Sequence, residues 1–169
     1  YDSPGSFLMS HLQTAERLLA EADDELNRQT DPARILDQAL AECDEALRLA
    51  PDDVAALRGR ASTLLKRASA EAIFERNKME NWDAAIAALD LAIARCPGDA
   101  ALLLDRSHGW AMRAQTGSDR RRDPLPDCSR AISDAEKALE IDPGSAVARL
   151  RRADAYHVRA ERKAILNED

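Results

Sequence analysis

Apolar residues recur along this 169-residue chain at spacings of three, four and seven, the pattern of the buried face of an amphipathic helix. The same pattern returns every 46 residues, and three prolines mark the period most clearly. They are Pro51, Pro97 and Pro143, in the near-identical segments ALRLAPDD, AIARCPGD and ALEIDPGS. A fixed period in this range predicts a helical repeat array in which each repeat packs against its neighbours.

Each repeat carries two apolar ladders, which predict two helices. The second-helix positions are Ala39, Ala85 and Ala131; Leu40, Ile86 and Ile132; Ala46, Ala92 and Ala138; and Leu47, Ile93 and Leu139. The first-helix positions are Ala15, Ala61, Ser107 and Ala153; Leu18, Leu64, Trp110 and Tyr156; and Ala22, Ala68, Ala114 and Ala160. Because proline ends a helix and the turn residues after it cap the next one, we expect three antiparallel helix pairs, at 6–51, 52–97 and 98–143. A partial repeat at 144–169 adds a final capping helix that runs to about 166, which makes seven helices in an all-α fold.

The repeat resembles the tetratricopeptide repeat (TPR). A small residue three positions before an aromatic residue, then two alanines seven residues apart, then proline, carry the resemblance. The matching residues are Ser107 and Trp110 on a first helix, and Trp82, Ala85, Ala92 and Pro97 on a second helix. The resemblance covers nearly the whole chain and implies an α-solenoid, with residues 1–169 as a single TPR-like domain.

The period is longer than the 34 residues of the TPR, so that each repeat has 12 additional residues (46 − 34). In the first two repeats these residues read as helix, which predicts first helices lengthened by about three turns. In the third repeat the sequence TGSDRRRDPLP predicts a loop. Pro32 and Pro124, each after an aspartate, predict the starts of two second helices.

Arginine occupies two first-helix positions in the later repeats, where it forms two rows down one face of the array. One row contains Arg60, Arg106 and Arg152, and the other contains Arg67, Arg113 and Arg159. Two interpretations stay open. The arginines form either a basic strip for an acidic partner or ion pairs with the acids that recur on the second helices, which are Asp44, Asp90 and Glu136.

Composition narrows the class of function. Alanine and leucine dominate the apolar residues, and no stretch has the roughly 20 apolar residues needed to span a bilayer. A net charge of −7 argues against nucleic acid as a partner. Residues 1–51 carry 4 basic and 11 acidic side chains, whereas residues 144–169 carry 6 basic and 4 acidic ones, a gradient that would suit head-to-tail self-association. Three widely spaced cysteines without a CxxC motif favour reduced thiols and a cytoplasmic location.

Motifs that carry catalysis are missing from the sequence. It contains no HExxH, GxxxxGK[ST] or GxSxG, and its three histidines are not repeat-equivalent. We therefore expect neither an enzyme nor a cofactor or metal site. The carboxylate clamp found in some TPR proteins is also not expected, because Asp105 stands where that clamp would need a cation or an amide.

The resemblance implies a protein–protein interaction module that binds a partner peptide or helix in a concave groove formed by first helices. The groove residues that it implies are Arg58, Ser62, Leu65, Leu104, His108, Ala111, Leu150, Asp154 and His157. The loop arginines Arg120, Arg121 and Arg122 are a second candidate docking point. The alternative is a structural spacer or self-assembly segment of a larger protein, because Leu150, Tyr156 and Ile165 on the last helix lack a following helix to cover them. The long-period repeat also resembles TPR regions of bacterial signalling proteins such as Ser/Thr kinases. We expect this chain to be a fragment of a longer one.

Overall fold

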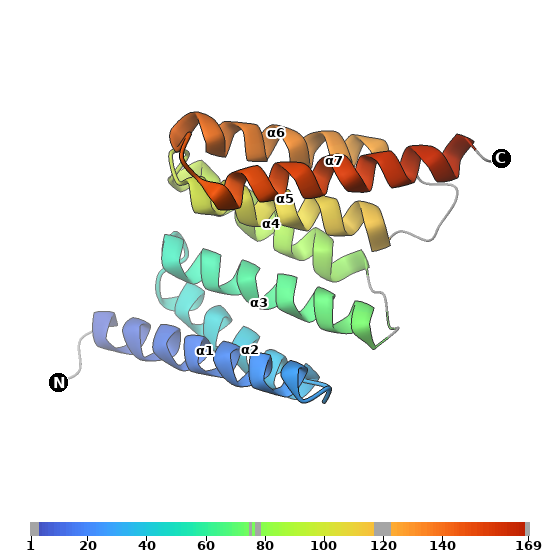
Figure 1. The fold of residues 1–169 in the computed structure, drawn as a ribbon. Helices are drawn as coiled ribbons and strands as arrows, with labels where there is room; N and C mark the ends of the chain where they lie inside the picture. The colour runs from blue at the N-terminus through green and yellow to red at the C-terminus, as the bar shows by residue number, and fades with distance from the viewer. Residues whose placement is uncertain (1–3, 75, 77–78, 117–122, 168–169) are drawn as a thin grey trace. The chain divides into compact units, whose positions relative to one another are not determined.

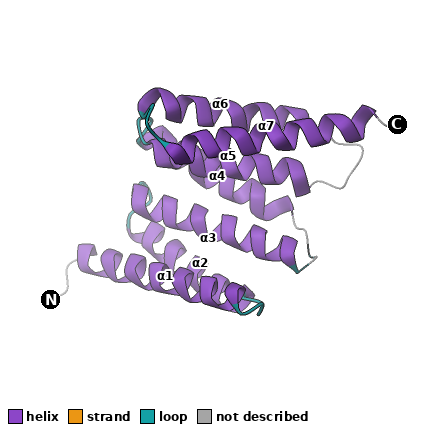
Figure 2. Cartoon of the chain, viewed as in Figure 1, coloured by secondary structure: helices purple, strands orange, loops and turns teal. Residues whose placement is uncertain are grey.

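The computed structural model describes residues 4–74, 76, 79–116 and 123–167. In this part of the chain there are seven α-helices and no strand (Figures 1 and 2). The helices are α1 (Pro4–Asn27), α2 (Ala33–Leu49), α3 (Val54–Ile73), α4 (Met79–Arg95), α5 (Ala100–Thr116), α6 (Leu125–Ile141) and α7 (Ala146–Asn167). The predicted all-α fold, with three helix pairs and a seventh helix, is confirmed.

The helix boundaries repeat with the spacing of the prolines. The second helices α2, α4 and α6 begin at residues 33, 79 and 125 and end at 49, 95 and 141, so both ends recur every 46 residues. The first helices α3, α5 and α7 begin at 54, 100 and 146, again 46 apart. The second helix and the turn that follows it therefore have the same length in all three repeats.

The added residues do not all extend the first helices. α1 and α3 end at equivalent positions, Asn27 and Ile73, which lie three residues, or about one turn, beyond the position equivalent to the end of α5 (116 − 46 = 70). The expected extension of about three turns, relative to the 34-residue repeat, stays a prediction. The rest of the added segment forms the connection to the second helix, and in the first repeat it turns through Gln29, whose φ of 61° is left-handed. The predicted loop at Arg120–Arg122 lies outside the described residues.

Two Asp-Pro pairs start second helices, as predicted. Pro32 and Pro124 occupy the N-cap positions of α2 and α6. The side chains of the preceding aspartates accept hydrogen bonds from the backbone N–H groups of Ala33 and Leu125, at 3.0 and 2.9 Å. Because proline cannot donate a hydrogen bond, these carboxylates serve N–H groups of the first turn that have no partner within the helix.

The chain divides into two compact units, Tyr1–Arg95 and Cys96–Asp169. In the first unit α2 packs against α1 and α3, and α3 packs against α4. In the second unit α6 and α7 both pack against α5 and against each other. The interiors consist mainly of alanine with a few large side chains, of which Leu36, Trp82 and Leu102 are fully buried. Small side chains let the helix backbones approach closely: Ser107 on α5 donates a hydrogen bond to the Ala131 carbonyl on α6, at 2.7 Å.

Four of the six arginines in the two rows form ion pairs, and not all of them with the expected acids. Arg60 pairs with Asp44 at 2.8 Å, as predicted. Arg106 binds both carboxylate oxygens of Asp134 at 2.8 Å, an acid whose equivalents are Glu42 in the first repeat and Ala88 in the second. The expected Arg106–Asp90 pair would join the two compact units and stays a prediction.

The second row forms ion pairs at two of its three positions. Arg67 pairs with Asp37 and Arg113 with Asp127, each at 2.8 Å. The expected pair between Arg152 and Glu136 is wrong, since no ion pair joins them in the structure as described. Glu136 lies on the exposed side of α6, whereas Asp127 and Asp134 face α5.

Candidate functional site

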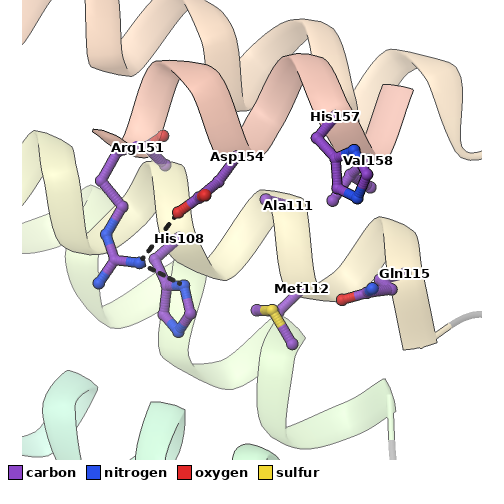
Figure 3. A pocket seen from close by; sticks show the side chains of 9 residues that line it. His108, Ala111, Met112, Gln115, Arg151, Asp154, His157 and Val158 are labelled. Atoms are coloured by element: carbon purple, nitrogen blue, oxygen red, sulfur yellow. Dashed lines mark hydrogen bonds and ion pairs between the residues drawn. The ribbon is translucent and has the colours of Figure 1, made fainter. Parts of the chain in front are cut away.

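A pocket of about 180 Å³ lies between two first helices, α5 and α7, within the second compact unit (Figure 3). Its walls follow helical periodicity, because residues three, four and seven apart share one face of a helix. From α5 it is lined by Ser107, His108, Ala111, Met112 and Gln115, and from α7 by Arg151, Asp154, His157 and Val158. The pocket therefore lies on the face where the TPR resemblance places a groove.

The pocket has an apolar floor and a polar rim. Ala111 and Val158 are each 5 % exposed and belong to the packed interior beneath it, with Ala131 and Ala155 around Ala111 and Ala114 and Cys128 beside Val158. The rim carries Gln115, which is exposed, and His157, whose side chain is 72 % exposed. Such a combination suits an apolar group that enters the pocket from a polar chain.

Charges inside the pocket largely offset one another. Arg151 lies between two of its neighbours, and its Nη1 is 3.3 Å from Nδ1 of His108 and 3.7 Å from a carboxylate oxygen of Asp154 (Figure 3). Because arginine can only donate, Nδ1 of His108 accepts and its proton resides on Nε2. Burial, aided by the adjacent Arg151 charge, lowers the pKa of His108 from its usual 6.5 to about 4. At neutral pH the imidazole is uncharged, so the pocket offers little net positive charge for binding an anion.

Acidification is expected to destabilise the fold through His108. In the unfolded chain its pKa returns to about 6.5, so between that value and about 4 the unfolded state holds more protons than the folded state. Stability is therefore lost as the pH falls through this window, by about 2 kcal/mol after allowance for the partial exposure of the ring. Urea unfolding at pH 7 and pH 4.5 tests this. His108→Gln should lose less stability than the wild type between these pH values, and equal losses would contradict the assignment.

Four of the predicted groove residues meet in this pocket: His108, Ala111, Asp154 and His157. Leu104 and Leu150 lie on the same two helices but do not line the pocket. Leu104 is buried, and Leu150 is 59 % exposed. Three more are on α3 in the first compact unit, namely Arg58, Ser62 and Leu65. The candidates Arg120, Arg121 and Arg122 lie outside the described residues.

Sequence reasoning missed five of the residues that line the pocket. These are Ser107, Met112, Gln115, Arg151 and Val158. Helical periodicity was a usable signal for all five, because each lies three, four or seven residues from a predicted groove residue on its own helix. Arg151 is the most important omission, since it interacts with both His108 and Asp154.

No group of three or more histidine, cysteine, aspartate or glutamate side chains is placed to hold a metal ion among the described residues. No helix in the same residues is long and apolar enough to cross a membrane.

Comparison with known proteins identifies the fold. No protein-family model matches the sequence, and no curated protein matches it either. Among solved structures, the NMR structure of the first TPR domain of the human RPAP3 protein is similar, with a TM-score of 0.52 over 90 % of this chain and 98 % of that chain. The fold is TPR-like. Because the two sequences are only 16 % identical, the likeness concerns the fold alone.

Proposed function

We propose that this chain is a protein-interaction module that holds a partner segment in a groove on its first helices. The observation that carries the proposal is the pocket between α5 and α7, which lies on the first-helix face of a TPR-like fold and combines an apolar floor with a polar rim. The proposal gives the chain no catalytic role. A cytoplasmic location and a place in a bacterial signalling protein stay predictions of the sequence.

The pocket favours a particular kind of partner. With His108 neutral and Arg151 beside Asp154, the pocket offers little net charge. We therefore expect a segment that inserts one apolar side chain above Ala111 and Val158, while its backbone meets polar groups such as Gln115 at the rim. An acidic segment would gain little here, because the positive charge is already opposed by a carboxylate.

The test is a selection of binding peptides from a random library displayed on phage, with the purified chain as the target. Gln115→Trp is expected to weaken the selected peptides at least tenfold, because a bulky side chain on the rim closes the pocket without disturbing the interior. Gln13→Trp is the matched control, since Gln13 is also an exposed helical glutamine but lies on α1. Its affinity should equal that of the wild type.

The selected sequences and their salt dependence provide a second check. An apolar anchor residue and affinity that changes little between 50 and 300 mM salt are expected of a nearly neutral pocket. Peptides that bind Gln115→Trp and the wild type equally well would contradict the proposal. So would peptides whose NMR shift changes fall outside α5 and α7.

A further inference from the structure

One face of α7 is exposed, whereas the equivalent faces of the other first helices are buried or partly buried. We call Ala153, Tyr156 and Ala160 the α7 outer face; Tyr156 is 42 % exposed and both alanines are exposed. The equivalent residues are buried in α1 (Ala15, Leu18 and Ala22, at 2, 6 and 0 %) and in α3 (Ala61, Leu64 and Ala68, at 0, 3 and 2 %). In α5, Ser107 and Ala114 are 1 % exposed and Trp110 is partly buried.

The helix pair α5 and α6 shows what covers such a face. α6 presents small side chains, Cys128, Ala131 and Ala135, all with no exposed surface. The close approach that these residues permit lets Ser107 reach the Ala131 carbonyl. In this pair the inner side of the covering helix therefore consists of small residues.

α6 also supplies two buried carboxylates, seven residues apart. Asp127 binds Arg113 and Asp134 binds Arg106, each at 2.8 Å. The two carboxylates are only 4 % and 5 % exposed, so each is removed from water together with its arginine. The pair spans two turns of both helices, which fixes the register of α6 on α5.

α7 repeats the arginine half of this arrangement without the acidic half. Arg152 and Arg159 are equivalent to Arg106 and Arg113, two turns apart. The described residues contain no ion pair of either with a carboxylate. Arg159 lies over the Tyr156 ring at 4.7 Å, just as Arg113 lies over the Trp110 ring at 5.5 Å. The α7 outer face therefore has equivalent arginines and the same kind of cation–aromatic pair as the equivalent face of α5.

We propose that the α7 outer face binds an amphipathic helix of a partner protein. This helix carries small residues along its inner side and two carboxylates seven residues apart, which pair with Arg152 and Arg159. Charge complementarity selects an acidic helix over a merely apolar one, and the two alanines of the face admit it at the short distance seen between α5 and α6. This surface is separate from the pocket between α5 and α7, so the result of testing one proposal does not decide the other.

The probe is a synthetic peptide of residues 123–143 of this same chain, which contains the α6 sequence. Fluorescence anisotropy is expected to show that it binds the full chain in trans. Ala153→Trp should weaken binding at least tenfold, because bulk on the face prevents close approach. Ala20→Trp, at an exposed alanine on α1, is the matched control and should bind as the wild type does.

A charge exchange tests the carboxylates directly. A peptide with Asp127→Asn and Asp134→Asn is expected to bind at least tenfold more weakly than the parent peptide. The protein variant Arg152→Asp should lose the parent peptide and regain affinity for a peptide with Asp134→Arg. Equal binding of all these combinations would overturn the proposal, since the face would then not recognise charge.

An isolated peptide can fail to fold as a helix, so a tethered form provides the second measurement. Appending residues 124–143 after Asp169 restores the repeat register, because Asp169 is equivalent to Asp123 (123 + 46). The appended helix should slow amide hydrogen exchange in α7, and Ala153→Trp should abolish that protection. Absence of both trans binding and added protection would overturn the proposal. Sedimentation that shows the unmodified chain dimerising through Ala153 would also overturn it, because the occupant would then be a second copy.

Discussion

Trp82→Ala is expected to lower the free energy of unfolding by about 3–5 kcal/mol. Trp82 lies on α4 and has no exposed surface. Its removal takes away the largest fully buried side chain among the described residues and leaves a cavity that neighbouring alanines are too short to fill. Urea unfolding followed by circular dichroism at 222 nm measures the loss, and the fluorescence of Trp110 reports separately on the second compact unit.

The same repeat position provides the control. Leu36, Trp82 and Cys128 are equivalent and all are fully buried. Cys128→Ala removes a single sulfur atom, so we expect a loss on the order of 1 kcal/mol. A Trp82→Ala loss no larger than that of Cys128→Ala would show that α4 closes over the gap, contrary to the expectation from close packing.

The fold was largely predictable from the sequence because its information is periodic. Helix starts and ends follow the prolines and capping residues, and these recur every 46 residues in both the sequence and the structure. The division of the added residues between helix and turn was not predictable from propensity alone. The added residues have helical propensity, but the chain must also turn back to begin the second helix, and in the first repeat Gln29 and Asp31 lie in that turn.

Features that do not recur in every repeat were harder to predict. Asp127 and Asp134 replace Asn81 and Ala88 of the preceding repeat, so a search for recurring acids passes over them. The pocket presents the same difficulty. Its residues come from two helices about 45 residues apart in the sequence, and only packing brings His108 next to Arg151. Periodicity identifies which face a residue shares, but not which unrepeated side chains meet across the helices.

Asp134→Ala is expected to cost about 3 kcal/mol, because it leaves Arg106 partly buried without the carboxylate that binds it at two points. Arg106→Met should be similarly damaging, since it strands a carboxylate that is 5 % exposed. The double variant Arg106→Met/Asp134→Ala should be less destabilised than the sum of the two single variants by about 2 kcal/mol. Urea unfolding of the four proteins provides the complete cycle.

This cycle also decides between the two interpretations of the arginine rows. If Arg106 belongs to a structural ion pair, the coupling free energy is large, and the charge reversal Arg106→Glu destabilises the fold whether or not a partner is present. If the row is instead a basic strip, the coupling is near zero, and Arg106→Glu removes partner binding at unchanged stability. The two-point hydrogen bonding of Arg106 to a buried acid favours the first outcome. Arg152, which has no such carboxylate opposite it in the residues described, is then the arginine of this row that remains available to a partner.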